Sequence, residues 1–299
     1  MARMRFEKWQ ALGNDYLIVE RDELPFELTP ARVRRLCEGH FGVFADGVLL
    51  LSPPTDAAHV ADLRIFNPDG SEAELSGNGA REAILYLRRR GWTGRDTFTI
   101  HTAAGKIRPT ITGIDTCTVD MGRASLSSRD FPDGPADGRG TIVAGGREWS
   151  FRHVSIGNSQ CAIHVDSLAE LEALELPAIG PAIEGDARFP NRTNVSWYTE
   201  LAQPGTGEAG RIRARIFERG VGETLSSGTG ATGAAVAHVQ RSLAARSNRA
   251  DARVSVVLDG GELEVEVGGD LHINLTGWAR PVFEGRLSED FEKELHETE

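Results

Sequence analysis

Apolar and polar residues alternate over short stretches along most of the chain, a period that is typical of β-strands. The clearest stretches lie near the C-terminus, at residues 253–258, 262–267 and 271–275, and turn-forming glycines separate them. Further strands are predicted at residues 16–20, 48–51, 61–66, 97–102, 106–112, 116–121, 148–156, 160–165 and 211–217. The pattern therefore predicts a protein in which antiparallel sheet dominates.

Helical spacing of apolar residues occurs in three segments, at residues 30–38, 79–90 and 231–246. The segment 79–90 places its apolar side chains on one face and ends in three arginines, which suit the negative end of a helix dipole. The segment 231–246 begins with alanines and glycines, so its backbone can pack closely against neighbours. Strands with a few helices among them predict the α+β class.

Two features of the first half of the chain recur in the second half. Ser76-Gly-Asn-Gly-Ala80 opens one predicted helix, and Ser227-Gly-Thr-Gly-Ala231 opens another. Gly13-Asn14 and Gly157-Asn158 each precede a strand at a similar offset. We therefore expect two pseudo-symmetric domains with a cleft between them, each a mostly antiparallel, β-barrel-like sheet around a central helix.

The domain boundary is predicted from composition. Residues 125–146 are rich in Ser, Gly, Asp and Pro and are interpreted as a loop or linker. The segment that follows the last strand is expected to return to the first domain. The predicted domains are residues 1–124 together with about 278–299, and residues 125–277.

The Ser-Gly-x-Gly runs have two interpretations. A helix start presents unpaired N–H groups and the positive end of the dipole, which together favour an anion such as a carboxylate. Alternatively, each serine is an ordinary N-cap and the glycines only permit a tight turn. No Gly-Lys-Ser/Thr follows either run, so neither is a nucleotide-binding P-loop.

Charge and cysteine usage limit the possible partners. The formal net charge of −11 provides no cationic field for nucleic acid or for an anionic membrane. The three cysteines, Cys37, Cys117 and Cys161, are widely spaced and are expected to be free thiols in a reducing compartment. No motif calls for a metal, pyridoxal phosphate or a nucleotide, and no signal peptide or membrane span is recognised, so we expect a cytoplasmic protein without a cofactor.

Several polar residues lie at strand ends and turns. The asparagines Asn14, Asn67, Asn158 and Asn194 each have a simple explanation as turn formers. Glu218 and Arg219 follow a predicted strand and directly precede the second glycine loop. The two charges are either an exposed ion pair or part of a binding site.

The chain resembles the diaminopimelate epimerase family. Seven motifs occur in the order of that family over roughly residues 4–235. They are Ala11-Leu-Gly-Asn-Asp-Tyr16, His40-Phe-Gly-Val-Phe-Ala-Asp46, Phe66-Asn-Pro-Asp-Gly-Ser-Glu-Ala73, Ser76-Gly-Asn-Gly-Ala-Arg81, Ile156-Gly-Asn158, Asn194-Val195, and Glu218-Arg-Gly-Val-Gly-Glu-Thr224 continuing through Ser227-Gly-Thr-Gly230.

The resemblance implies a cofactor-independent epimerase that converts LL-diaminopimelate to meso-diaminopimelate, in the synthesis of lysine and peptidoglycan precursors. One thiolate removes the α-proton from one face, and a thiol on the other face returns a proton. Carried over by position, the two catalytic residues are Ser76 and Ser227, and Glu218 contacts the reacting amino group. The remaining roles are also implied by position: the α-carboxylate is held by the amides of Gly77, Asn78, Gly228 and Thr229, and the distal end of the amino acid by Asn14, Asn67, Asn158, Asn194 and Arg219.

The chain departs from the family pattern at several positions. Serine stands in place of both catalytic cysteines, Gly47 replaces a glutamine, and Ser159-Gln160 replaces Pro-His. An unassisted serine hydroxyl ionises less readily than a thiol and is a poor general base. A substrate-trapping Cys-to-Ser variant accounts for the serines but not readily for Gly47 or Gln160, so natural divergence is favoured.

Three functions stay open. The first is an amino-acid epimerase acting on diaminopimelate. The second is a diverged isomerase or lyase that acts on another amino acid. The third is a ligand-binding relative without catalysis. In each case the partner is a small amino acid, and a homodimer is a further expectation.

Overall fold

The chain forms two compact units. The computed structural model describes residues 3–74, 76–202, 210–243 and 251–298. The first unit comprises Met1–Val119 and Gly277–Glu299, and the second comprises Asp120–Thr276. The C-terminal segment therefore belongs to the unit in which the chain begins.

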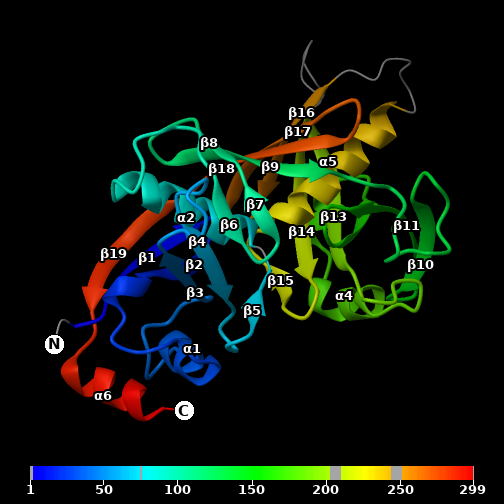
Figure 1. Cartoon of the computed structure of the whole chain (residues 1–299). Helices are drawn as coiled ribbons and strands as arrows, with labels where there is room; N and C mark the ends of the chain where they lie inside the picture. The colour runs from blue at the N-terminus through cyan, green and yellow to red at the C-terminus, as the bar shows by residue number, and fades with distance from the viewer. Residues whose placement is uncertain (1–2, 75, 203–209, 244–250, 299) are drawn as a thin grey trace. The chain divides into compact units, whose positions relative to one another are not determined.

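The first unit is built on a mixed sheet with the strand order β19-β1-β2-β3-β4-β6-β7, and β5 pairs with β4 (Figure 1). Its strands are β1 (Arg5–Ala11), β2 (Asn14–Glu20), β3 (Val48–Ser52), β4 (Asp62–Phe66), β5 (Glu72–Ala73), β6 (Ile100–Thr102), β7 (Gly105–Ile107) and β19 (Arg280–Arg286). The short β8 (Pro109–Ile111) pairs with the first residues of β9 (Thr116–Arg123), the strand that continues into the second unit.

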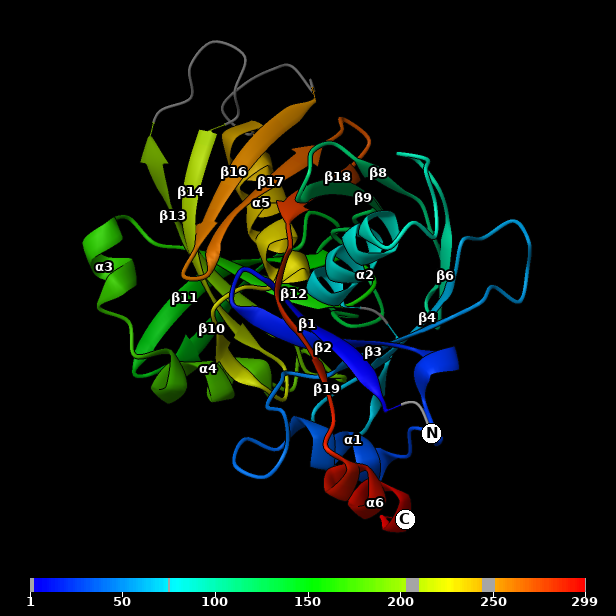
Figure 2. The ribbon, with the colours of Figure 1, turned by 90° about the vertical axis from the view of Figure 1, so that its left-hand side faces the viewer.

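One helix is central to the first unit. Helix α2 (Gly77–Arg89) packs on β1, β2 and β3, and its residues 78–87 are all buried. Outside it, α1 (Pro30–Cys37) and α6 (Glu289–Glu297) lie side by side at one end of the unit, as Figure 2 shows. Arg35 of α1 joins them through an ion pair with Glu294 of α6. A 3₁₀ turn, η1 (Arg21–Glu23), follows β2.

The second unit repeats this plan on a larger sheet, in the order β10-β11-β12-β13-β14-β16-β17-β18, with β15 paired to β14. Its strands are β10 (Arg139–Ala144), β11 (Arg147–Ser155), β12 (Ser159–His164), β13 (Asn194–Ala202), β14 (Gly210–Glu218), β15 (Gly222–Thr224), β16 (Ala252–Leu258), β17 (Gly261–Val267) and β18 (His272–Trp278). Its central helix, α5 (Gly228–Leu243), packs against strands β11 to β14, β16 and β17. Two short helices, α3 (Leu168–Glu172) and α4 (Leu176–Glu184), lie on the connection from β12 to β13.

The internal repeat predicted from the sequence is confirmed at the level of topology. In the first unit β4 leads through the short β5 and α2 to β6, and β4 and β6 are parallel. In the second unit β14 leads through β15 and α5 to β16, again in parallel. Helical connections also join the parallel pairs β2–β3 and β12–β13.

These crossovers correct the barrel expectation. A helical connection returns the chain to the same end of the sheet, so the strands that it joins run parallel. Antiparallel pairs still predominate, as predicted, but each unit is a mixed, open sheet rather than a closed antiparallel barrel.

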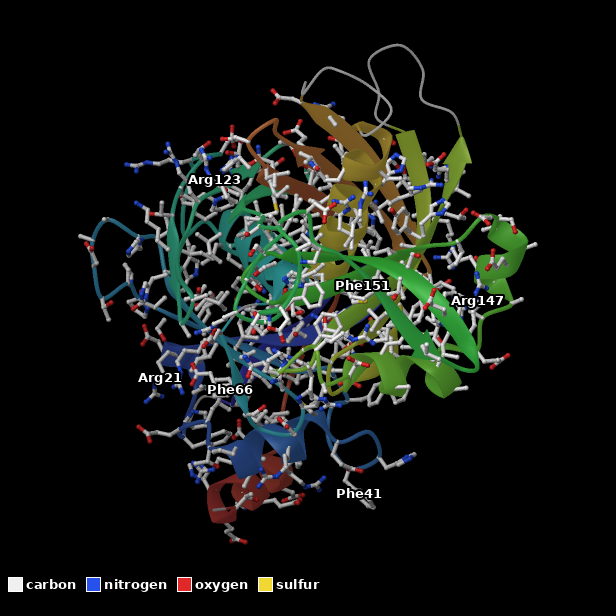
Figure 3. All side chains as sticks on the ribbon, turned by 90° about the vertical axis from the view of Figure 1, so that its right-hand side faces the viewer. Arg21, Phe41, Phe66, Arg123, Arg147 and Phe151 are labelled. Carbon is white, nitrogen blue, oxygen red and sulfur yellow. The ribbon has the colours of Figure 1, made fainter. Side chains whose placement is uncertain are left out.

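The segment predicted as a loop at residues 125–146 contains a strand. Its last part forms β10, which pairs along its whole length with β11. Gly140 lies within β10, and a Cβ there would come within 2.4 Å of the Phe151 ring, so this glycine is required by packing and does not mark a linker. The side chain of Phe151 is labelled in Figure 3. The strand predicted at residues 106–112 is also divided, because β7 pairs with β6 whereas β8 pairs with β9.

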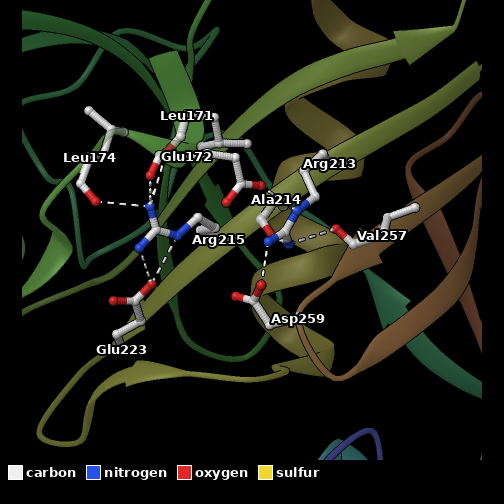
Figure 4. Close-up of polar contacts among 9 residues, drawn as sticks. All are labelled: Leu171, Glu172, Leu174, Arg213, Ala214, Arg215, Glu223, Val257 and Asp259. Atoms are coloured by element: carbon white, nitrogen blue, oxygen red, sulfur yellow. Dashed lines mark hydrogen bonds and ion pairs between the residues drawn. The ribbon is translucent and has the colours of Figure 1, made fainter. Parts of the chain in front are cut away.

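Two arginines of β14 fasten the hairpin that leads to α5 (Figure 4). Arg215 donates to the carboxylate of Glu223 in β15 and to three carbonyl oxygens at the end of α3, those of Leu171, Glu172 and Leu174. Arg213 forms ion pairs with Glu172 and with Asp259. Arg215 therefore joins β15 to the end of α3, and Arg213 joins β14 to α3 and to the turn between β16 and β17.

Candidate active site

Each unit begins its central helix with one of the predicted serines, and the two local structures match. Ser76 caps α2: its Oγ accepts the N–H of Gly79 at 3.1 Å, and its carbonyl accepts the N–H of Ala80. Ser227 does the same for α5, where its Oγ accepts the N–H of Gly230 at 3.2 Å. Both serines are therefore N-caps, and each hydroxyl lies at the positive end of a helix dipole.

Gly77 with Asn78, and Gly228 with Thr229, supply the first amides of the two helices. Helix starts of this kind are suited to a carboxylate. The side chain of Asn78 is held within the first unit, where its Nδ2 donates to Asn14 Oδ1 at 3.2 Å and its Oδ1 accepts from Arg81. Asn14 in turn donates to Asp46 at 2.8 Å. The structure thus brings Asn14 to the start of α2.

A tyrosine that the sequence interpretation did not select also lies at this point. The hydroxyl of Tyr16, in β2, donates to Ser76 Oγ at 3.2 Å, and only 5% of the tyrosine is exposed. Asn67 behaves differently from Asn14: its amide donates to Ser71 Oγ at 2.9 Å inside its own turn. No hydrogen bond from Asn67 to Ser76 or Asn14 is found among the described residues.

In the second unit, the register of a hairpin places Glu218 near Ser227. The pairing of β14 with β15 sets Glu218 opposite Gly222, and the hydroxyl of Thr224 donates to Glu218 Oε1 at 2.8 Å. The hydroxyl of Ser227 is near enough to the Glu218 carboxyl group to affect its pKa. Burial raises the pKa of Glu218 above its usual value, and these two hydroxyls partly offset the rise. A carboxyl group with a raised pKa beside a hydroxyl is suited to proton transfer.

Asn158 reaches the same helix start. It lies in the tight turn between β11 and β12, where the preceding Gly157 has a φ of +86°, and its amide donates to Thr229 Oγ1 at 3.3 Å. Gln160 holds it in place by donating to Asn158 Oδ1 at 2.7 Å. Gln160 packs its Cβ close to Gly233 of α5, so the side chain is wedged against the helix.

Asn194 and Arg219 position the loop after β14. The buried amide of Asn194 accepts the backbone N–H of Arg219 at 2.8 Å and donates to the carbonyl of Ser159. Glu184 accepts the next amide, that of Gly220, at 2.7 Å. The guanidinium of Arg219 is exposed and donates to the carbonyl of Asn191. Asn194 and Arg219 therefore fix the loop that follows Glu218 through contacts with the backbone.

The cysteines lie outside this chemistry. Cys37, Cys117 and Cys161 are unpaired and buried, and burial raises the pKa of Cys37 and of Cys117 to about 12. Within the described ranges, no group of His, Cys, Asp or Glu has an arrangement that could hold a metal ion. None of the described helices has the length and apolar character needed to cross a bilayer.

Solved structures define the fold class. A Bacillus anthracis phenazine biosynthesis protein of the PhzF family superposes with a TM-score of 0.69 at 19% identity, covering 96% of this chain and all of the other. A hydroxyproline epimerase from Agrobacterium vitis superposes with a TM-score of 0.61 at 16% identity, covering 97% of this chain and 93% of the other. The chain therefore has the two-unit fold of these two proteins.

Sequence comparison identifies the family. The family model for diaminopimelate epimerase matches residues 6–127 and 152–282. A diaminopimelate epimerase of Synechococcus sp. strain JA-3-3Ab is 40% identical, over 96% of this chain and 99% of its own length. One from Acidovorax ebreus is 35% identical, over 95% and 97% respectively. The chain belongs to the diaminopimelate epimerase family and is thus an isomerase of the amino-acid epimerase class.

Proposed function

We propose that this chain epimerises LL-diaminopimelate to meso-diaminopimelate by two-base proton transfer, with Ser76 and Ser227 in the places of the two thiols. The observation that carries the proposal is the matched pair of helix-capping serines, one in each unit, each with a second group beside it that can exchange a proton with it. The product would supply lysine and peptidoglycan precursor synthesis.

Serine requires help that cysteine does not. A serine hydroxyl ionises much less readily than a thiol, so an isolated serine cannot remove an α-proton at neutral pH. Glu218 supplies that help to Ser227: as the serine oxygen takes the α-proton, its own proton passes to the carboxylate. Desolvation of Glu218 favours this transfer because it makes the carboxylate a stronger base.

The substrate carboxylate is assigned to the two helix starts. The amides of Gly77, Asn78, Gly228 and Thr229 lie at positive dipole ends, and no basic side chain is needed to hold an anion there. Electron withdrawal by hydrogen bonds to the carboxylate stabilises the carbanion that forms next to it. Asn14, Asn67, Asn158, Asn194 and Arg219 are proposed to contact the distal end.

A second candidate is epimerisation or isomerisation of a different amino acid. It is favoured by Gln160, which stands where the family has histidine and which fastens Asn158 rather than offering a titratable ring. The two candidates share the proton-transfer groups and differ only in the substrate's distal end.

Proton NMR of the protein with LL-diaminopimelate in deuterated water tests the proposal. The α-proton signal should disappear while the meso isomer accumulates, and Ser227→Ala should abolish both changes without abolishing binding measured by calorimetry. Binding without exchange in the unchanged protein would refute catalysis. An absence of binding would move the search to other amino acids.

The double variant Ser76→Cys/Ser227→Cys tests whether the site is arranged for this reaction. A thiol ionises near neutral pH, so both groups gain acidity without a change in position, and we expect epimerisation at least tenfold faster. The matched control is Ser226→Cys, which adds a thiol next to the site but not at a cap. No gain in the double variant would contradict the assignment of these positions.

A further inference from the structure

The two serines differ in the groups around their hydroxyls. Ser227 accepts the N–H of Gly230 at 3.2 Å and lies beside the Glu218 carboxyl group. Ser76 instead receives two hydrogen bonds, from the N–H of Gly79 at 3.1 Å and from the phenol of Tyr16 at 3.2 Å. With both acceptor positions of its oxygen engaged, Ser76 has its own proton available for a third group.

Two donors on one oxygen also change its acidity. Hydrogen bonds to an oxygen favour its ionised form, and a desolvated site strengthens the effect. Tyr16 is almost completely buried, so water does not compete strongly for its hydroxyl. Its phenol is far more acidic than a serine hydroxyl and can replace the proton that Ser76 gives away.

Gly47 makes this arrangement possible. A Cβ at residue 47 would lie 2.2 Å from the carbonyl oxygen of Phe66 and 2.6 Å from Cε1 of the Tyr16 ring. Gly47 does not have a positive φ, so the glycine is required by space and not by backbone conformation. Its carbonyl accepts the N–H of Leu17 at 3.0 Å, which fixes the backbone beside Tyr16. The Phe66 carbonyl and the Tyr16 ring therefore together occupy the place that a side chain at residue 47 would need.

We propose that Tyr16 is the positioning and proton-supplying residue for Ser76, and that it makes Ser76 the acid of the pair while Glu218 makes Ser227 the base. This inference rests on the proposed function. In the forward step, the α-carbanion takes the proton of Ser76: a C–H bond forms, the Ser76 O–H bond breaks, and the Tyr16 proton passes to Ser76. The phenolate that remains and the protonated Glu218 return to their starting states by exchange with water. The reverse reaction uses the same atoms, with the Tyr16 phenolate as the final base.

The first test does not depend on activity. In Ser76→Cys, the Tyr16 phenol should donate to the thiolate, and adding Tyr16→Phe should remove that bond. The pH midpoint for alkylation of Cys at position 76 by iodoacetamide should rise by about one pH unit in the double variant, since a hydrogen bond to a charged group has this strength. The buried native thiols, whose pKa values burial raises, leave a low background.

Tyr86→Phe is the matched control. Tyr86 is a buried tyrosine of the same unit, but its hydroxyl donates to Glu20 at 2.7 Å. Added to Ser76→Cys, it should leave the alkylation midpoint unchanged. Equal midpoints with and without Tyr16→Phe would overturn the proposal.

The second test uses the native serines. Tyr16→Phe should lower kcat for epimerisation at least tenfold with little change in KM, and should shift the pH profile, because binding groups are untouched and proton supply is lost. If Tyr16→Phe shifts the alkylation midpoint in the Ser76→Cys background but the native protein exchanges no α-proton, the Tyr16–Ser76 hydrogen bond is supported and the proposed reaction is refuted. An unchanged kcat and pH profile in an active protein would refute the role of Tyr16.

Discussion

Glu82 should make the first unit less stable as the pH rises. The residue lies in α2 and is fully buried, and neither carboxylate oxygen has a hydrogen-bond partner of good geometry among the described residues. Burial raises the pKa of Glu82 well above its usual value; neighbouring Arg81 opposes the rise, and the carboxylates of Asp15 and Asp46 reinforce it. Over a range of pH, Glu82 is therefore protonated in the folded protein and ionised in the unfolded chain.

The sign and the size of the effect follow from proton binding. Between the unfolded pKa, near 4.5, and the raised folded pKa, the native state holds one more proton than the unfolded state. Each pH unit in that window lowers the free energy of unfolding by about 1.4 kcal/mol. Glu82→Gln has no proton to bind, so this loss should be absent from the variant.

The assay is urea unfolding followed by tryptophan fluorescence at several values between about pH 5 and about pH 7. The free energy of unfolding of the unchanged protein should fall relative to that of Glu82→Gln by about 1.4 kcal/mol per pH unit. Glu23→Gln, which alters an exposed glutamate of the same unit, should follow the unchanged protein. Parallel curves for the unchanged protein and Glu82→Gln would show that Glu82 is ionised in the fold, and the reasoning would be wrong.

Two further results are expected. Glu218→Gln should abolish α-proton exchange, and the rate of the unchanged protein should rise with pH through the raised pKa of Glu218, because a base acts when it is ionised. Thr224→Val removes a hydroxyl that lowers this pKa, so the acidic limb of the pH–rate profile should move to higher pH. An acidic limb that does not move would belong to another group. Gly180→Ala in α4 should reduce the free energy of unfolding by about 1–3 kcal/mol, because its Cβ would lie 2.6 Å from the Phe217 ring. Gly185→Ala, whose Cβ would meet nothing closer than 3.4 Å, is the control in urea unfolding, and equal losses in both would remove the steric explanation.

The strands that alternation predicted most clearly are those with one buried face. Strands β16, β17 and β18 alternate between buried and half-buried positions, and this alternation is visible as alternating residue types. Strand β13 is buried on both faces over most of its length, and β19 is exposed almost throughout. Neither strand alternates, and neither was predicted. Periodicity reports a difference between two faces, so strands whose faces are alike show no alternation, and those that were predicted, such as β3 and β12, were predicted from short apolar runs instead.

The residues of the candidate site also differ in whether a local sequence pattern could predict them. The helix-starting serines could be found because Ser-Gly-x-Gly is a local pattern that occurs twice. The partner of each serine could not be found in the same way. Tyr16 is 60 residues from Ser76, and only the packing of β2 beside α2 brings the two hydroxyls together. Glu218 reaches Ser227 through the register of a hairpin, which local patterns do not specify.

The departures from the family pattern fit together in space, and this bears on whether the serines belong to a working site. A cysteine-to-serine change by itself places no demand on residue 47, where the Phe66 carbonyl and the Tyr16 ring together leave no room for a Cβ. Gln160, at the position where the resemblance to the family implies a histidine, packs against α5 and holds Asn158 at the start of that helix. Under the proposed function, the Tyr16 phenol beside Ser76 and the Glu218 carboxyl group beside Ser227 would provide the acid–base help that a hydroxyl needs and a thiol does not.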